Sequence, residues 1–136
     1  MIISFSVFKE KILDGTKTQT IRRYSEFQYK RFCNAKKYQL YWGNPRNGGE
    51  LIKEVEPSEL PRIIRFMQLD SHIGLNNRFL RKMNCILDEK AAGFIPLLPL
   101  AKMDGFDDDF EMWDWFKGNY GEDMFTKKFM VLRWKP

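Results

Sequence analysis

Short apolar segments separated by turn-forming residues run along the whole chain, and this pattern limits the fold to architectures built from several short strands. Seven strands are predicted, over residues 1–4, 18–22, 38–42, 51–55, 62–69, 79–87 and 128–134. Helices are expected over 7–14 with Ser6 as the cap, over the basic segment 24–37, and from Asp107 onward. Because no βαβ rhythm is present, the predicted fold class is α+β. We expect a small β-barrel of five to seven mostly antiparallel strands with two or three flanking helices.

The chain of 136 residues is expected to form a single domain, residues 1–136, around one core. Aromatic residues make up 15% of it, enough either to fill a core or to provide surfaces on which bases stack. In the helix expected from Asp107, Phe110, Trp113 and Phe116 recur at helical spacing. We assign this aromatic stripe to the core.

The sequence carries a net charge of +5, and most of the positive excess lies near the N-terminus. Residues 9–37 hold nine Lys or Arg against three acids, whereas residues 104–114 hold six acids and no basic residue. A basic segment of this kind favours an anionic partner, RNA or a nucleotide-like ligand. A solvated surface of mixed charge explains the same pattern, so both interpretations stay open.

Two cysteines and one histidine are too few for a disulfide framework or a zinc site, so neither a metal nor another cofactor is expected. His72 lies near Asp70 within residues 70–77, which are expected to form a loop, and so small a pair does not indicate a metal site. Residues 1–8 are interrupted by serines and lead into charged residues, unlike a signal peptide or a membrane span. We expect a reduced, cytoplasmic protein with no membrane partner, a monomer or weak oligomer.

The segment 15–23, Gly-Thr-Lys-Thr-Gln-Thr-Ile-Arg-Arg, has the highest density of groups suited to binding an anion. It brings three hydroxyls, one amide and three cations into nine residues, directly after the glycine expected to end the first helix. The same residues also suit an edge strand, because Lys and Thr deter pairing with other molecules. The composition of the segment does not decide between the two roles.

At these residues the chain resembles the ASCH family, small PUA-like β-barrels associated with RNA. The family's Gly-x-Lys-Thr-x-Thr-Ile-Arg element is complete at residues 15–22. A second element, Ala-x-x-Asp/Glu-Gly-Phe, matches residues 101–106 and precedes a helix rich in aromatic residues, Trp113, Trp115, Phe116 and Tyr120. Residues 38–46 and the closing strand fit as well, so the resemblance covers nearly the whole chain. It implies a PUA-like barrel that binds RNA or a modified nucleoside.

The ASCH family also includes acetylcytidine amidohydrolases, which use a Lys, a Thr and a Glu. The resemblance maps these catalytic roles onto Lys17, Thr20 and Asp104. Asp104 is one methylene shorter than the family's acid, and residues 62–96 contain material that those enzymes largely lack. A metal-independent ribonuclease is the other enzymatic alternative, with Lys17 and Arg22 stabilising phosphate charge and Thr20 positioning the sugar.

The proposed trio makes chemical sense only under one geometric condition. A Thr hydroxyl becomes a nucleophile when a base takes its proton, and a Lys can be that base if burial lowers its pKa. In a regular strand Lys17 and Thr20 point to opposite faces. We therefore expect Lys17 to lie in the turn after Gly15, from which its side chain can reach back.

Seven further residues are predicted to contact RNA or a nucleoside: Thr18, Arg22, Arg23, Trp42, Asn44, Arg46 and Lys53. The cations among them could meet phosphates, and the loop 44–49 offers backbone N–H groups. A polar hairpin tip explains the loop equally well, and Trp42 also suits a core position.

Overall fold

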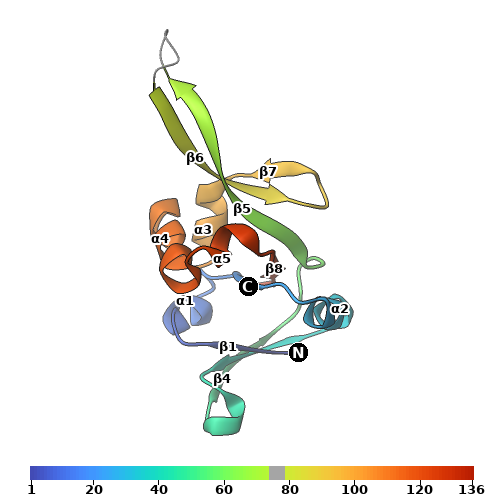
Figure 1. Ribbon diagram of the computed structural model, residues 1–136. Coiled ribbons are helices and arrows are strands. Elements are labelled where there is room, and N and C mark those ends of the chain that lie inside the picture. Colours follow the sequence, from blue (N-terminus) through green and yellow to red (C-terminus); the bar gives the residue numbers. More distant parts are fainter. Residues whose placement is uncertain (74–78) are drawn as a thin grey trace.

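The structure, a computed structural model, describes residues 1–73 and 79–136, and of residues 70–73 and 79–82 it describes the backbone alone (Figure 1). The fold is α+β, as predicted. The strands are β1 Ile2–Phe5, β2 Gln19–Arg23, β3 Tyr38–Trp42, β4 Glu50–Val55, β5 Arg62–Ile73, β6 Phe79–Asp88, β7 Gly93–Ile95 and β8 Phe129–Arg133. The helices are α1 Lys9–Leu13, α2 Glu26–Asn34, α3 Leu97–Met103, α4 Asp109–Tyr120 and α5 Asp123–Thr126, with a 3-10 turn at Pro45–Asn47. These described elements outnumber the strands and helices expected.

The strands form two sheets, and no closed barrel is found among the described residues, so the small PUA-like barrel stays a prediction. One sheet has the order β1-β3-β4 and the other β2-β8-β5-β6-β7. β1 pairs with β3 in parallel, and the remaining pairs are antiparallel, as predicted. The sheets meet beyond the end of β4, where Ser58 N donates to Arg133 O at 3.1 Å and Lys135 N donates to Glu56 O at 2.9 Å.

The other edges of the two sheets, β1 and β2, carry no ladder pairing with each other within the described ranges. We call the line along which these two edges face each other the seam. One side chain spans it: Nη2 of Arg22 on β2 donates to the backbone oxygen of Ser4 on β1 at 2.6 Å. An unpaired sheet edge leaves polar backbone groups that need partners. The seam between β1 and β2 is therefore a place where polar side chains gather.

Strand β8 is buried on both faces because it lies between two hydrophobic clusters. Phe129 and Val131 belong to the cluster that includes α3, α4 and α5, while Met130 and Leu132 belong to the cluster that includes α1 and α2. Figure 1 shows the first group of helices together at the base of the long β5–β6 hairpin. The single core expected from the sequence is thus divided by β8 into two halves.

Three local expectations were wrong. Ser6 does not cap α1; the helix begins at Lys9, and the capping position is Phe8, which has a left-handed backbone with φ of 66°. Strand β5 continues to Ile73, where it pairs with Phe79, so residues 70–73 are strand and not loop, while residues 74–77 lie outside the described residues. The aromatic stripe of α4 is core only in part, because Phe110 in the first turn is 72% exposed.

Helix α3 was not predicted from the sequence, and it contains one proline and follows another. Proline is tolerated in the first turn of a helix, where backbone N–H groups have no partner within the helix. Pro96 occupies the capping position of α3 and Pro99 falls in its first turn. None of the helices described here is long and apolar enough to cross a membrane.

Candidate functional site

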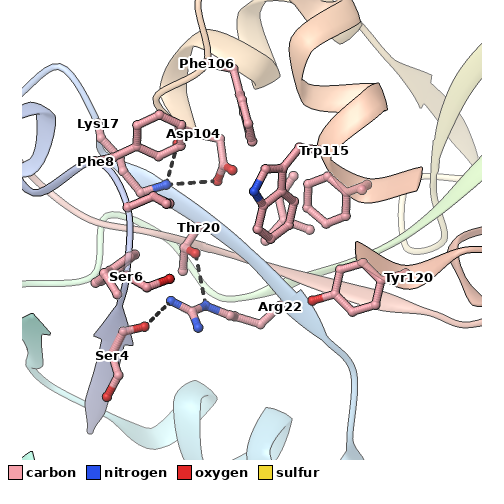
Figure 2. Close-up of a pocket in the computed structure, with 14 residues that line it drawn as sticks. Ser4, Ser6, Phe8, Lys17, Thr20, Arg22, Asp104, Phe106, Trp115 and Tyr120 are labelled. Atoms are coloured by element: carbon pink, nitrogen blue, oxygen red, sulfur yellow. Dashed lines mark hydrogen bonds and ion pairs between the residues drawn. The ribbon is translucent and has the colours of Figure 1, made fainter. Parts of the chain in front are cut away.

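A pocket lies at the seam between β1 and β2 (Figure 2). Its walls come from the end of β1 and the residues that follow it, from residues 17–22, from the loop after α3, and from α4. Its volume is about 100 Å³, several times the space that one water molecule needs. Parts of the chain far apart in sequence therefore meet around a space large enough to hold part of a small ligand.

Lys17 is the buried cation of this pocket, with only 2% of its surface exposed. Its Nζ donates to the backbone oxygen of Asp104 and lies 3.4 Å from Oδ1 of the same residue. The ammonium group also lies over the rings of Phe5 and Phe8, at 5.5 and 5.4 Å from their centroids. Aromatic faces and a carboxylate both stabilise a buried ammonium, so they offset part of the cost of burying the charge of Lys17.

The turn before β2 gives Lys17 the position that the sequence required of it. Gly15 has φ of 83°, and the backbone N–H of Lys17 then donates to Lys11 O at 2.9 Å. Lys17 therefore precedes the strand, which begins at Gln19, and it is not bound by the strand's alternation. Its side chain and that of Thr20 line the same pocket, as expected.

Asp104 is buried with 5% of its surface exposed, and its Oδ1 has no hydrogen-bond partner among the described residues. The 3.4 Å contact with Lys17 Nζ is an ion pair without hydrogen-bond geometry. Burial raises the pKa of the Asp104 carboxyl to about 6, against a smaller opposing effect of the Lys17 charge. Burial likewise lowers the pKa of Lys17, and Asp104 opposes that shift. The Asp104 carboxyl therefore keeps its proton to a higher pH than in water, and the Lys17 ammonium loses its proton at a lower pH. Shifts of this kind are typical of groups that act in acid–base catalysis.

Thr20 presents its hydroxyl to the pocket from β2. Its Oγ1 accepts a hydrogen bond from Nε of Arg22 at 3.1 Å. Because that bond occupies a lone pair of Oγ1, the hydroxyl proton remains for an acceptor within the pocket. The guanidinium of Arg22 lies over the ring of Phe5 at 4.9 Å, which fixes its plane.

Gly105 is needed next to the ion pair of Lys17 and Asp104. Its φ is 100°, and a Cβ atom at this position would lie 3.1 Å from the ring of Phe8 and 3.3 Å from Cδ of Lys17. Its carbonyl oxygen accepts a hydrogen bond from Lys11 Nζ at 2.5 Å. The glycine of the 101–106 motif thus permits the close approach that buries Lys17.

Several pocket residues were not identified as site residues from the sequence. Phe106, Trp115 and Tyr120 form an aromatic wall, and Figure 2 shows Trp115 and Tyr120 across the pocket from Ser4 and Ser6. Trp115 and Tyr120 were noted only as part of the resemblance, and nothing in the local pattern marked the two serines. Their position depends on the seam, a feature of tertiary structure.

Six of the predicted contact residues do not line the pocket: Thr18, Arg23, Trp42, Asn44, Arg46 and Lys53. Arg23 lies outside the pocket and pairs with Asp123 at 3.0 Å. Asn44 Oδ1 accepts from the backbone N–H of Arg46 at 2.9 Å and so caps the short 3-10 turn. Trp42 packs against the second cluster. The hairpin tip is a local turn, separate from the pocket.

The raised pKa of Asp104 has a measurable effect on stability. Because its pKa is about 6 in the folded protein against 3.8 for an ordinary aspartate, the folded state holds this proton more tightly than the unfolded chain. The contribution of Asp104 to the free energy of unfolding should therefore fall by up to about 3 kcal/mol as pH rises from about 4 to about 6. Urea unfolding across this range should show this fall as a pH-dependent difference between wild type and Asp104→Asn, and no such difference between wild type and the exposed control Asp114→Asn. A difference between wild type and Asp104→Asn that stays constant with pH would contradict this assignment.

Comparison with known proteins leaves the pocket as the basis for assigning a function. No protein-family model, no curated protein and no solved structure was found to match the chain. The resemblance of residues 15–22 and 101–106 to the ASCH family therefore stays a prediction. Since a fold by itself does not determine function, the function has to be inferred from the chemistry of the pocket.

Proposed function

We propose that this protein binds a nucleoside-like ligand, free or presented by an RNA strand, in the pocket at the seam between β1 and β2. The observation that carries the proposal is the convergence of Lys17, Thr20, Arg22 and Asp104 beside an aromatic wall. Aromatic rings provide stacking surfaces for a base, and the polar groups can pair with its edge. We include in the proposal that the chain is an ASCH domain whose two sheets form an open variant of the PUA-like barrel.

Ion pairs on the surface favour a small ligand over a long polyanion. Many cations of residues 9–37 are paired with carboxylates at 4 Å or less. Examples are Lys9 with Glu50 and Lys37 with Glu54. A paired cation contributes less to counterion release along a phosphate backbone than a free one. The pocket therefore supports ligand binding better than the basic segment as a whole does.

Stacking on Trp115 is the part of this proposal that mutation tests most directly. Trp115→Ala should weaken the binding of cytidine at least about fivefold, because each base–aromatic stack contributes on the order of 1–3 kcal/mol. Trp42→Ala is the matched control, since Trp42 lies outside the pocket. Calorimetric titration measures both. Equal losses in the two variants, or a loss in Trp42→Ala alone, would place the ligand elsewhere.

Deacylation of a modified cytidine is the second candidate function, favoured by the position of Lys17 and Thr20 on one pocket. In this mechanism the Thr20 hydroxyl attacks the acyl carbon of the amide and Lys17, in its neutral form, takes the hydroxyl proton. As the bond from Oγ1 to the acyl carbon forms, negative charge develops on the acyl oxygen, and the positive charge of Arg22, which lies next to Thr20, stabilises it. The protonated Asp104 or Lys17 then gives a proton to the leaving amine, and water releases the acyl group from Thr20.

Turnover of acetylcytidine tests this second function separately from binding. Wild type should release cytidine, and Thr20→Val should lose at least about 100-fold in rate, because the nucleophile is removed while the shape is kept. Thr16→Val, an exposed change in the same segment, should leave the rate unchanged. Binding of cytidine by wild type without any turnover would make the protein a binding module and exclude the enzymatic role.

A further inference from the structure

Arg22 is a partly buried cation that forms no direct ion pair within the described residues; the carboxylate of Asp104, in the same pocket, acts on it only at longer range. Its two hydrogen bonds within the described residues go to neutral acceptors, Thr20 Oγ1 at 3.1 Å and Ser4 O at 2.6 Å. A guanidinium has five N–H donors, so three of them have no partner in this part of the chain. No ion pair is formed by Arg22 among the residues that the structure describes.

The other partly buried arginines whose side chains are described are all paired. Arg62 contacts Glu59 at 3.0 Å, Arg65 contacts Glu89 at 2.5 Å, and Arg133 contacts Glu59 at 2.8 Å. Removing a charge from water is unfavourable unless an opposite charge compensates it. The fold follows this rule at three sites and departs from it at Arg22, inside the pocket.

The charges of the pocket do not balance without a ligand. Lys17 and Asp104 form one pair, with the acid at 3.4 Å from the ammonium. Arg22 stays charged at any physiological pH, because a guanidinium does not lose its proton in proteins. The ionised pocket therefore has an excess of one positive charge, located at the seam, next to the Thr20 hydroxyl.

We propose that the ligand of this pocket carries an anionic group, the phosphate monoester of a nucleotide, and that Arg22 binds this phosphate. The nucleotide part rests on the proposed function; the anion part rests on Arg22 alone. A guanidinium matches phosphate oxygens with parallel N–H donors, and a partly dry pocket strengthens the contact. The phosphate lies at the seam, while the base lies against the aromatic wall. The monoester can belong to a free nucleotide or to the end of an RNA strand.

The test compares cytidine with cytidine 5′-monophosphate in wild type, Arg22→Gln and Arg31→Gln. Arg31 is the matched control, because it also lacks an ion pair among the described residues but is exposed on α2. Wild type and Arg31→Gln should bind the monophosphate at least about tenfold more tightly than cytidine. In Arg22→Gln this ratio should fall to about one. Arg22→Lys, which keeps the charge but lacks the parallel N–H donors of the guanidinium, should give an intermediate ratio. This variant replaces Arg22→Gln if Arg22→Gln does not fold.

Equal affinities of wild type for the two ligands, or an undiminished ratio in Arg22→Gln, would overturn the proposal. An equal loss in Arg31→Gln would also overturn it, because the attraction would then be diffuse. Inorganic phosphate separates this proposal from the proposed function. If neither cytidine nor its monophosphate binds, but phosphate raises the Tm of wild type and not of Arg22→Gln, the anion site stands and nucleoside binding fails. If phosphate and the monophosphate both leave wild type unchanged, the anion site fails.

An oligoribonucleotide with and without a 5′-phosphate identifies the source of the monoester. Tighter binding of the phosphorylated strand than of the free monophosphate assigns the site to an RNA end. The reverse order assigns it to a free nucleotide. Both results support an anion site at Arg22, provided that the advantage of the phosphorylated form is lost in Arg22→Gln.

Discussion

The buried ammonium of Lys17 is the constraint on which the candidate site depends. An ammonium removed from water needs partners, and Lys17 finds them in the backbone oxygen and carboxylate of Asp104. This contact ties the turn after α1 to the loop after α3, two parts of the chain separated by 87 residues. Gly105 permits the approach, since any larger residue would press on Phe8 and Lys17. The pocket's shape and its acid–base properties thus have one physical origin.

The open seam between β1 and β2 gives this pair access to a ligand. A fully paired barrel would place ladder hydrogen bonds along these edges, where the structure instead has the side chains of Thr20 and Arg22. The contacts of Arg133 and Lys135 with the chain after β4 join the sheets on the other side. Among the described residues the two sheets are therefore joined on one side and unpaired on the other, where the polar side chains of the pocket gather.

Local sequence patterns predicted most of the strands because they depend on neighbours along the chain. The alternation of residues 129–134 is an example, although the burial of both faces required a second layer that no local pattern specifies. The turn position of Lys17 was predicted because a strand would have separated it from Thr20. The prediction that Arg46 and Lys53 belong to the site was wrong, because charge and turn composition do not say which face of the molecule a hairpin occupies. The missing partner of Arg22 could not be predicted, because a pairing carboxylate can be near in sequence, as Glu59 is to Arg62, or far from it, as Glu59 is from Arg133.

We propose that a nucleoside-like ligand occupies the space between Thr20 and Trp115. The most direct measurement is the set of intermolecular nuclear Overhauser effects between the H5 and H6 protons of bound cytidine 5′-monophosphate and assigned side chains of the protein. We expect contacts to the indole of Trp115 and to the methyl group of Thr20, because both residues line the pocket. Contacts to the hairpin tip near Arg46, or to α2, would show that the ligand binds elsewhere and would contradict the proposal.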